Sequence, residues 1–228
     1  MIRTWIMSAI IAITAMAFIG TATAHADDID SDATASQGTL IPETASSLPH
    51  QTGPATWAQQ SIDQFATEMG LTQVHWVTLE SGQTIVTPCR VYSSVNAYVY
   101  CPSTDTAYIG LDQGDYFNEG TNPLAAALLT AHEWGHHLQR AMGSRTFGQS
   151  NEDGADCVGG AWLKWYTDRT GISMSLADAV GFYELAVKIE RPSWMPNDPH
   201  GTRWDRSIAM GTGYFGGLAA CNRYSPVM

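Results

Sequence analysis

Positive charge is scarce in this chain of 228 residues, which has 11 lysines and arginines against 22 aspartates and glutamates. The formal net charge is −11 at pH 7 with histidine counted as neutral. Nucleic acids and anionic membrane surfaces are bound by basic patches, so a chain this acidic disfavours both kinds of partner. The charge indicates no particular substrate, because an acidic surface also serves solubility outside a cell.

Long apolar runs are missing except near the N-terminus. After residue 26, no stretch approaches the ~20 apolar residues that a membrane-spanning helix needs. Arg3 precedes an apolar run over residues 5–19, and small residues then lead to Ala24-His25-Ala26. This order is typical of a secretory signal peptide over residues 1–26, and a retained membrane anchor is the alternative. We therefore expect a secreted, extracellular protein with no stable membrane anchor after the signal peptide is cleaved.

Cysteines are few, and no two of the four have the C-x-x-C spacing that is typical of zinc-binding cysteines. In an exported chain, four cysteines indicate two disulfides. Cys89 and Cys101 flank a β-rich stretch, so a local bridge across a hairpin is the simplest pairing. Cys157 and Cys221 would then form a long-range bridge that ties the last helix to the core.

Hydrophobic patterning divides the rest of the chain in two. Residues 27–55 are polar and have little to bury, which predicts a disordered leader before a single domain over residues 56–228. That domain opens with a predicted helix and continues with β-type segments at residues 74–79, 83–92, 96–101 and 106–111. Four helices are predicted after them, at residues 123–142, 151–169, 175–190 and 203–220. Strands followed by helices predict an α+β fold, with a small N-terminal antiparallel or mixed sheet and then a helical bundle.

Three of the seven histidines lie within the eight residues "HEWGHHLQ", directly after an apolar run. His132 and His136 are four residues apart, so a helix projects both rings from one face and lets them bind one metal ion. Glu133 lies at the edge of that face, within reach of a water on the ion. This H-E-x-x-H pattern predicts a zinc hydrolase with one Zn²⁺ ion, whereas two solvated surface histidines would fit poorly after an apolar run. His137 points about 100° away from His136, which predicts a packing or supporting role.

A catalytic zinc site needs a third protein ligand besides the two histidines. The extended pattern H-E-x-x-H-x-x-G-x-x-H does not supply it, because Gln139 and Met142 occupy its last glycine and histidine positions. The other known source is a carboxylate from a following helix. Glu152, in "SNEDGADC", lies 16 residues after His136 at the start of the next predicted helix. We therefore predict Glu152 as the third ligand.

Two further acids follow Glu152. Asp156 lies four residues later on the same helix face, and we expect it to accept the outer N–H of a ligand histidine. Asp153 suits the helix N-terminus as a capping acid. Two alternatives stay open: Glu152 and Asp156 could both complement the helix N-terminus, or Asp156 could be the ligand with Glu152 behind it.

"HEWGH" together with "NEDGAD" resembles the glutamate-zincin metallopeptidases, in which an N-E-x-x-[SA]-D helix carries the third ligand. More closely, the chain is similar to the bacterial neutral zinc metallopeptidase family of YpfJ-like proteins. The similar blocks, between about Thr56 and Cys221, are "AYVYCPSTDTAYIGLD", "AHEWGHHLQ", "EDGADCVGGAW", "HGTRWDR", "MGTGYFGG" and "ACN". The resemblance implies a zincin-like fold, with the active-site helix between sheet and bundle, and peptidase activity. Asp205 departs from the family segment, which has glutamine there.

The expected reaction is hydrolysis of a peptide bond in a peptide or protein substrate by a zinc-activated water. Glu133 would take the proton as general base and return it to the departing amine. His200 is our candidate for the second oxyanion donor, although it could instead cap a helix, and Tyr183 and Tyr214 are rival donors. We expect Arg206 to tie the last helix to an acid.

An extended substrate would pair with an exposed strand edge, and residues 106–112 are our candidate; an ordinary core strand is the alternative. Two other functions compete with a secreted peptidase. One is a catalytically silent protein-binding module on a peptidase scaffold, which is disfavoured because the base, Glu133, is present. The other is a zinc hydrolase of a non-protein, cell-wall amide, which would use the same metal chemistry.

Overall fold

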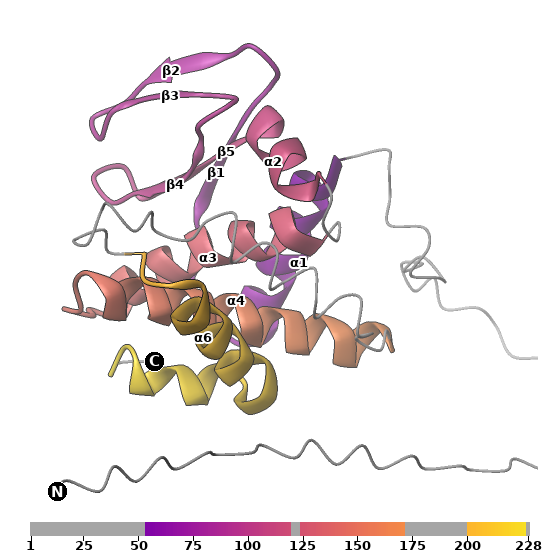
Figure 1. Cartoon of the computed structure of the whole chain (residues 1–228), viewed down its shortest axis with the longest axis vertical. Helices are drawn as coiled ribbons and strands as arrows, with labels where there is room; N and C mark the ends of the chain where they lie inside the picture. The colour runs from indigo at the N-terminus through magenta and orange to yellow at the C-terminus, as the bar shows by residue number, and fades with distance from the viewer. Residues whose placement is uncertain (1–52, 120–123, 172–199, 227–228) are drawn as a thin grey trace, which may run out of the picture. The chain divides into compact units, whose positions relative to one another are not determined.

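The computed structural model describes residues 53–119, 124–171 and 200–226. The chain separates into two units, residues 1–39 and 40–228, and every described residue belongs to the second. The predicted signal peptide, most of the predicted leader and the predicted helix at 175–190 lie outside the described residues. The described part combines two small sheets with several helices (Figure 1), which confirms the predicted α+β class.

The larger sheet is mixed and has three strands. It contains β1 (His75–Leu79), β4 (Tyr98–Cys101) and β5 (Thr106–Gly110), in the order β1-β5-β4. β5 runs parallel to β1 and antiparallel to β4, and all five of its residues are buried. The expectation that residues 106–112 offer an exposed edge is therefore wrong. β5 is the central strand because both of its edges are paired, and the chain turns into a helix, α2 (Leu111–Asn118), directly after it.

Residues 83–92 form two short strands and not the one that the sequence predicts. β2 (Thr84–Val86) and β3 (Val91–Ser93) pair antiparallel in a separate two-stranded sheet. Pro88 lies between them, and a proline has no N–H for a ladder, so the strand cannot continue through it. The Thr87 N–H donates to the Arg90 carbonyl oxygen at 3.1 Å and closes the turn.

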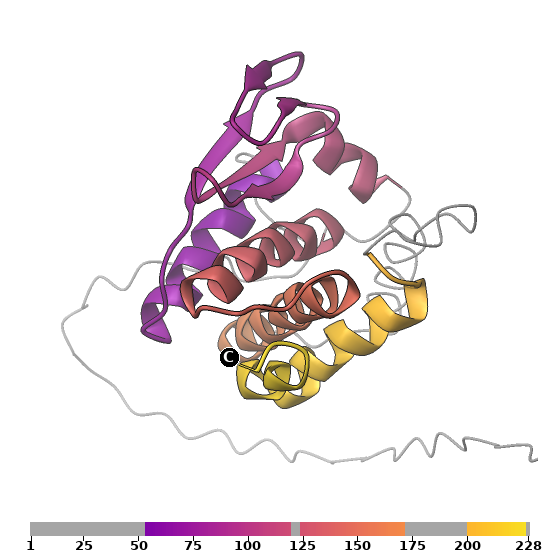
Figure 2. The same cartoon turned by 90° about the vertical axis from the view of Figure 1, so that its left-hand side faces the viewer.

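The remaining helices form a layered stack. They are α1 (Gly53–Glu68), α3 (Leu124–Ala141), α4 (Gln149–Thr170), α6 (Arg203–Gly216) and the 3-10 helix η1 (Leu218–Arg223). α3 contacts the three-stranded sheet as well as α4, and α6 packs against α4 (Figure 2). The predicted helix over 203–220 is divided at Gly217, whose φ of 67° lies in the left-handed region and ends the α-helix. Among the described helices, none has both the length and the apolar character that crossing a membrane requires.

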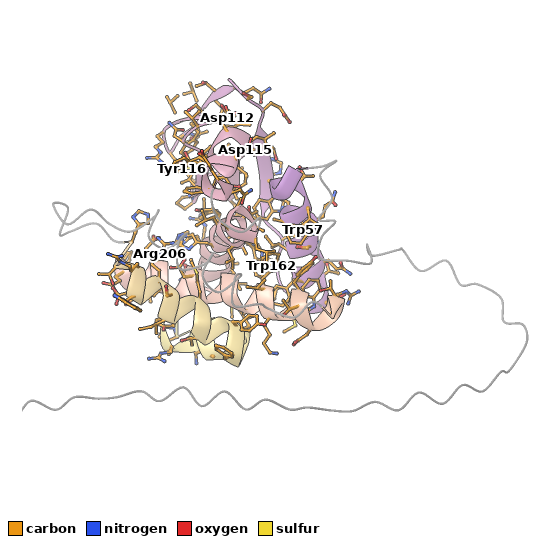
Figure 3. The ribbon with its side chains drawn as sticks, turned by 45° about the vertical axis from the view of Figure 1, so that its right-hand side comes forward. Trp57, Asp112, Asp115, Tyr116, Trp162 and Arg206 are labelled. Atoms are coloured by element: carbon orange, nitrogen blue, oxygen red, sulfur yellow. A yellow bond between two sulfur atoms is a disulfide. The ribbon has the colours of Figure 1, made fainter. Side chains whose placement is uncertain are left out.

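The main core lies where α1, α3 and α4 meet. Trp134 of α3 and Trp162 of α4 are fully buried, and Trp57 of α1 packs edge-on against Trp162 with ring centroids 5.9 Å apart (Figure 3). The alanine-rich first half of α3 is buried throughout, because small side chains let neighbouring elements approach it closely. The histidine motif therefore sits on a helix that is packed on several sides.

Both predicted disulfides are confirmed. Cys89 bonds to Cys101, and Cys157 bonds to Cys221. The first bridge joins the β2–β3 turn to the end of β4, so it links the two sheets and does not cross a single hairpin. The second bridge ties η1 to α4, as the sequence predicts for the end of the chain.

Candidate metal centre

α3 and α4 bring the three predicted ligands together. His132 and His136 lie one turn apart on α3, and their rings meet edge-on with centroids 4.6 Å from each other. Glu152, in the first turn of α4, faces both rings: its Oε2 lies 3.3 Å from His132 Nε2, and its Oε1 lies 3.5 Å from His136 Nε2. The three ligand atoms all lie within 4.8 Å of one another. In the described ranges, this is the one group of three or more His, Cys, Asp or Glu that could hold a metal ion.

A glycine inside the histidine motif allows α4 to come this close. A Cβ on Gly135 would lie 2.8 Å from the Cα of Ala155, which is nearer than two such atoms can approach. α4 begins at Gln149, two residues earlier than predicted, so Glu152 is the acid of its first turn. The predicted capping role of Asp153 is therefore wrong. That side chain is buried, and burial, together with nearby Asp156 and Asp205, raises its pKa to about 6.

Asp156 lies behind His132, on the side away from Glu152. Its Oδ1 accepts hydrogen bonds from His132 Nδ1 and from Nη2 of Arg206, each at 2.8 Å. Asp156 and Arg206 are both almost completely buried (Figure 3 labels Arg206, near the start of α6). Arg206 thus ties α6 to an acid, as expected from the sequence. Asp205, at the position that departs from the family segment, forms a capping box with Thr202 at the start of the same helix.

The charges at the centre are strongly coupled. Burial by itself lowers the pKa of His132, but the charge and hydrogen bond of Asp156, together with Glu152, raise it to about 10. Burial raises the pKa of Glu152, but the interactions with the His132 and His136 imidazoles outweigh it and hold that pKa well below its usual range. A neutral His132 that donates its Nδ1 proton to Asp156 in a hydrogen bond would point the lone pair of its Nε2 at the Glu152 carboxylate. A proton or a cation between the two groups relieves that repulsion.

Glu133 is held by the sheet and does not belong to the ligand group. Its Oε2 accepts the backbone N–H of Tyr100 at 2.7 Å, and the side chain is 7% exposed. Tyr100 belongs to β4, which pairs with β5 on its other edge, so the outer edge of β4 faces α3. The sequence predicts this strand within residues 96–101, but sequence reasoning missed its edge position beside Glu133. Pro102, directly after it, was the available signal, because proline is confined to edge strands and strand ends.

His137 points away from the ligand group and links α3 to two loops. Its Nδ1 lies 2.8 Å from Asp105 Oδ1, and its Nε2 lies 2.9 Å from Thr72 Oγ1. Asp105, in the β4–β5 turn, has a left-handed φ of 51° and also accepts the hydroxyl of Tyr100. His137 therefore supports, through Asp105, the strand β4 that carries the Tyr100 N–H.

His200 lies at the rim of the centre. Its Nε2 is 3.7 Å from Glu152 Oε2, and its side chain is 49% exposed. Of the two rival donors, Tyr214 packs against the main core and Tyr183 lies outside the described residues. Of the two candidates that the structure describes, His200 is therefore the one that lies beside Glu152.

No protein-family model matches the chain, and no solved structure matches it. Uncharacterized proteins of Mycobacterium tuberculosis (strains CDC 1551 and H37Rv) and Mycobacterium bovis (strain ATCC BAA-935 / AF2122/97) are 33% identical to it over 108 residues. The match covers 41% of this chain and 36% of each of these relatives, so the chain spans about a third of their length. Their names assign no activity.

Proposed function

We propose that this protein is a secreted zinc-dependent metallopeptidase of the zincin type, with His132, His136 and Glu152 as the ligands of one Zn²⁺ ion. The observation that carries the proposal is the convergence of two imidazole nitrogens and one carboxylate, with their ligand atoms within 4.8 Å of one another. This donor set is that of catalytic zinc sites, which keep one position open for water. The resemblance to the YpfJ-like family supports the same assignment.

The residues present fit a divalent cation on a second ground. Glu152 Oε2 is buried and has no hydrogen-bond partner among the described residues, although two imidazole Nε2 atoms face its carboxylate. A buried carboxylate oxygen without a hydrogen-bond partner is costly, and a bound cation removes that cost. The two disulfides support export, because disulfides persist in oxidising compartments.

The chemistry divides among a few side chains. A bound zinc ion would act as a Lewis acid and lower the pKa of a coordinated water. Glu133 takes a proton from the attacking water and returns it to the leaving amine; the Tyr100 N–H holds one carboxylate oxygen, so the other can accept the proton. Asp156 keeps the Nδ1 proton on His132, so that Nε2 is available to the ion. His200 donates a hydrogen bond to the oxyanion.

The substrate would lie along the outer edge of β4. The N–H of Tyr100 is directed away from β5 and toward the general base, so a strand added at this edge would pass Glu133. Pairing with a strand edge recognises the peptide backbone and not a particular sequence. β4 therefore replaces residues 106–112 as the proposed docking strand.

The test is hydrolysis of casein by purified mature protein. We expect cleavage that a chelator abolishes and added zinc restores, and that Glu133→Gln lowers by at least about 10³-fold, because that change removes the base and keeps the ligands. Glu152→Gln should lose bound zinc, measured by metal analysis, whereas Glu133→Gln should retain it. Stoichiometric zinc without proteolysis would contradict a peptidase and favour a binding module or a non-protein amide as substrate. Protein purified without zinc, and unable to take it up, would contradict the metal centre.

A further inference from the structure

The second ligand histidine requires a hydrogen-bond acceptor behind it. If Nε2 of a histidine binds a metal ion, the ring proton must stay on Nδ1, and an acceptor at Nδ1 fixes that tautomer. Asp156 is this acceptor for His132. Behind His136, two side-chain amides approach Nδ1: Gln139 Oε1 at 3.2 Å and Asn151 Nδ2 at 3.1 Å. A single proton can be donated to one of them, and the structure distinguishes the two.

The orientation of the Gln139 amide is fixed by a main-chain partner. Its Nε2 donates to the carbonyl oxygen of Asn151 at 2.8 Å, and a carbonyl oxygen can only accept. Oε1 must therefore be the atom that faces His136. The side chain is 2% exposed, and a Cβ on Gly154 would lie 2.3 Å from its Nε2, so the glycine makes room for the amide. Gln139 is thus enclosed between α3 and the first turn of α4.

We propose that Gln139 is the positioning residue of the second zinc ligand. The Gln139 Oε1 accepts a hydrogen bond from His136 Nδ1 and thereby keeps His136 Nε2 directed at Glu152. The Gln139 Nε2 donates to α4 and holds its first turn against α3. The acidic side chains of Glu133, Glu152 and Asp156 are already buried around the two rings, and a neutral amide supplies the hydrogen bond without adding a further negative charge. The inference rests on the proposed function, since it assumes that the three ligands bind zinc.

The test measures zinc affinity by chelator competition, together with the visible absorption spectrum of the Co²⁺-substituted protein. Gln139→Met keeps the volume and removes both hydrogen bonds, and we expect about 10- to 100-fold weaker zinc binding and a changed Co²⁺ spectrum. Gln139→Glu keeps the acceptor at Nδ1 and should bind zinc more tightly than Gln139→Met, although it loses the donor to the Asn151 carbonyl oxygen and adds a buried charge. Gly154→Ala, which displaces the amide, should repeat the loss seen in Gln139→Met and replaces that variant if it does not fold.

Asn151→Ala is the competing variant, because it removes the other amide beside His136 and leaves the Asn151 carbonyl in place. We expect it to bind zinc more tightly than Gln139→Met does. If Asn151→Ala loses affinity and Gln139→Met does not, Asn151 is the partner of His136 and the inference is overturned. If the wild-type protein binds zinc, and Gln139→Met and Gly154→Ala bind it with the same affinity, this inference alone is overturned. A wild-type protein that binds no zinc would overturn the proposed function as well.

Discussion

At the scale of single residues, one carboxylate oxygen connects the candidate metal centre to α6. Asp156 Oδ1 accepts from His132 and from Arg206, and the side chains of Asp156 and Arg206 are 0% and 2% exposed. Charges buried so completely are tolerated because they are paired and hydrogen-bonded. Arg206 therefore has two effects: it neutralises a buried acid, and it holds the acid that orients His132.

Replacing Arg206 tests this pairing. We expect Arg206→Met to lower the free energy of unfolding by about 3–5 kcal/mol, because it leaves the Asp156 charge buried beside His132 alone. Urea unfolding of metal-free protein measures the loss. The double variant Arg206→Met, Asp156→Asn is the control, since a neutral amide still accepts from His132 and no longer needs a cation. It should recover a large part of the stability, and equal stability of the single and double variants would contradict the pairing.

Asp105 gives a pH-dependent prediction. Burial alone raises the pKa of its carboxyl, but hydrogen bonds from Tyr100 and His137 outweigh burial and hold that pKa below its usual value. A lowered pKa in the folded protein means that the stabilisation is present above the unfolded pKa and disappears as pH falls through the folded pKa. Asparagine also tolerates the left-handed φ of 51° at this position.

We therefore expect Asp105→Asn to lower the melting temperature at pH 7 and to have no effect near pH 2. The loss at pH 7 should be below about 1 kcal/mol, because the side chain is 54% exposed and solvent screens the interaction. Thermal unfolding of both proteins across this pH range measures it. A difference that is the same at every pH would mean that the carboxylate charge does not contribute.

At the scale of elements, two glycines let α4 and α6 touch. A Cβ on Gly160 would lie 1.9 Å from the Met210 carbonyl oxygen, and a Cβ on Gly213 would lie 1.8 Å from that of Cys157. Both neighbours are backbone atoms, which cannot turn aside as a flexible side chain can. Close packing of these helices is what brings Arg206 to Asp156.

Gly213→Ala should accordingly separate the two helices. We expect a loss of about 1–3 kcal/mol in the free energy of unfolding, although alanine alone favours a helix. Gly211, two residues away in the same helix, has open space where a Cβ would be, with nothing within 4 Å of that position. Gly211→Ala should therefore be neutral or stabilise the protein by up to about 1 kcal/mol. Chemical unfolding of the two variants compares them, and equal losses would contradict the close approach.

The elements that the sequence predicts well are those with a long local pattern. α3 and α4 carry enough apolar residues at helical spacing that their bounds differ by one or two residues from the expectation. α2 was missed because it has eight residues and a glycine inside it. The central place of β5 could not be seen either, since sheet order depends on pairing with β1, a strand from much earlier in the chain. Alternation along one strand carries no information on its neighbours.

At the scale of the whole molecule, the candidate centre likewise contains residues that a local sequence pattern predicts and contacts that depend on distant parts of the chain. His132, Glu133 and His136 could be identified because one helix fixes their mutual positions, and Glu152 because its motif follows at a characteristic distance. The Tyr100 N–H on Glu133 joins a strand to a helix 33 residues away, and no local pattern encodes that contact. Gln139 lies one turn from His136, but its role depends on Asn151 and Gly154 of the next helix.

The two disulfides should differ in what they contribute to stability. Cys157–Cys221 closes a loop with a sequence separation of 64, and Cys89–Cys101 one of 12. In the chain-entropy model, the longer loop restricts the unfolded chain more, which gives about 4 kcal/mol against about 3 kcal/mol. Paired Cys→Ala variants, unfolded in urea without metal, measure both contributions.

The folded state strengthens the same ranking. Cys157 directly follows Asp156 on α4, and η1, which holds Cys221, contacts both α4 and α6. Loss of this bridge loosens the end of the chain from the helix that orients His132. We therefore expect the Cys157/Cys221 variant to bind zinc more weakly as well, whereas the Cys89/Cys101 variant should retain the affinity of the ligand set. A larger stability loss from the shorter loop would contradict the ranking that loop length and the folded-state contacts both predict.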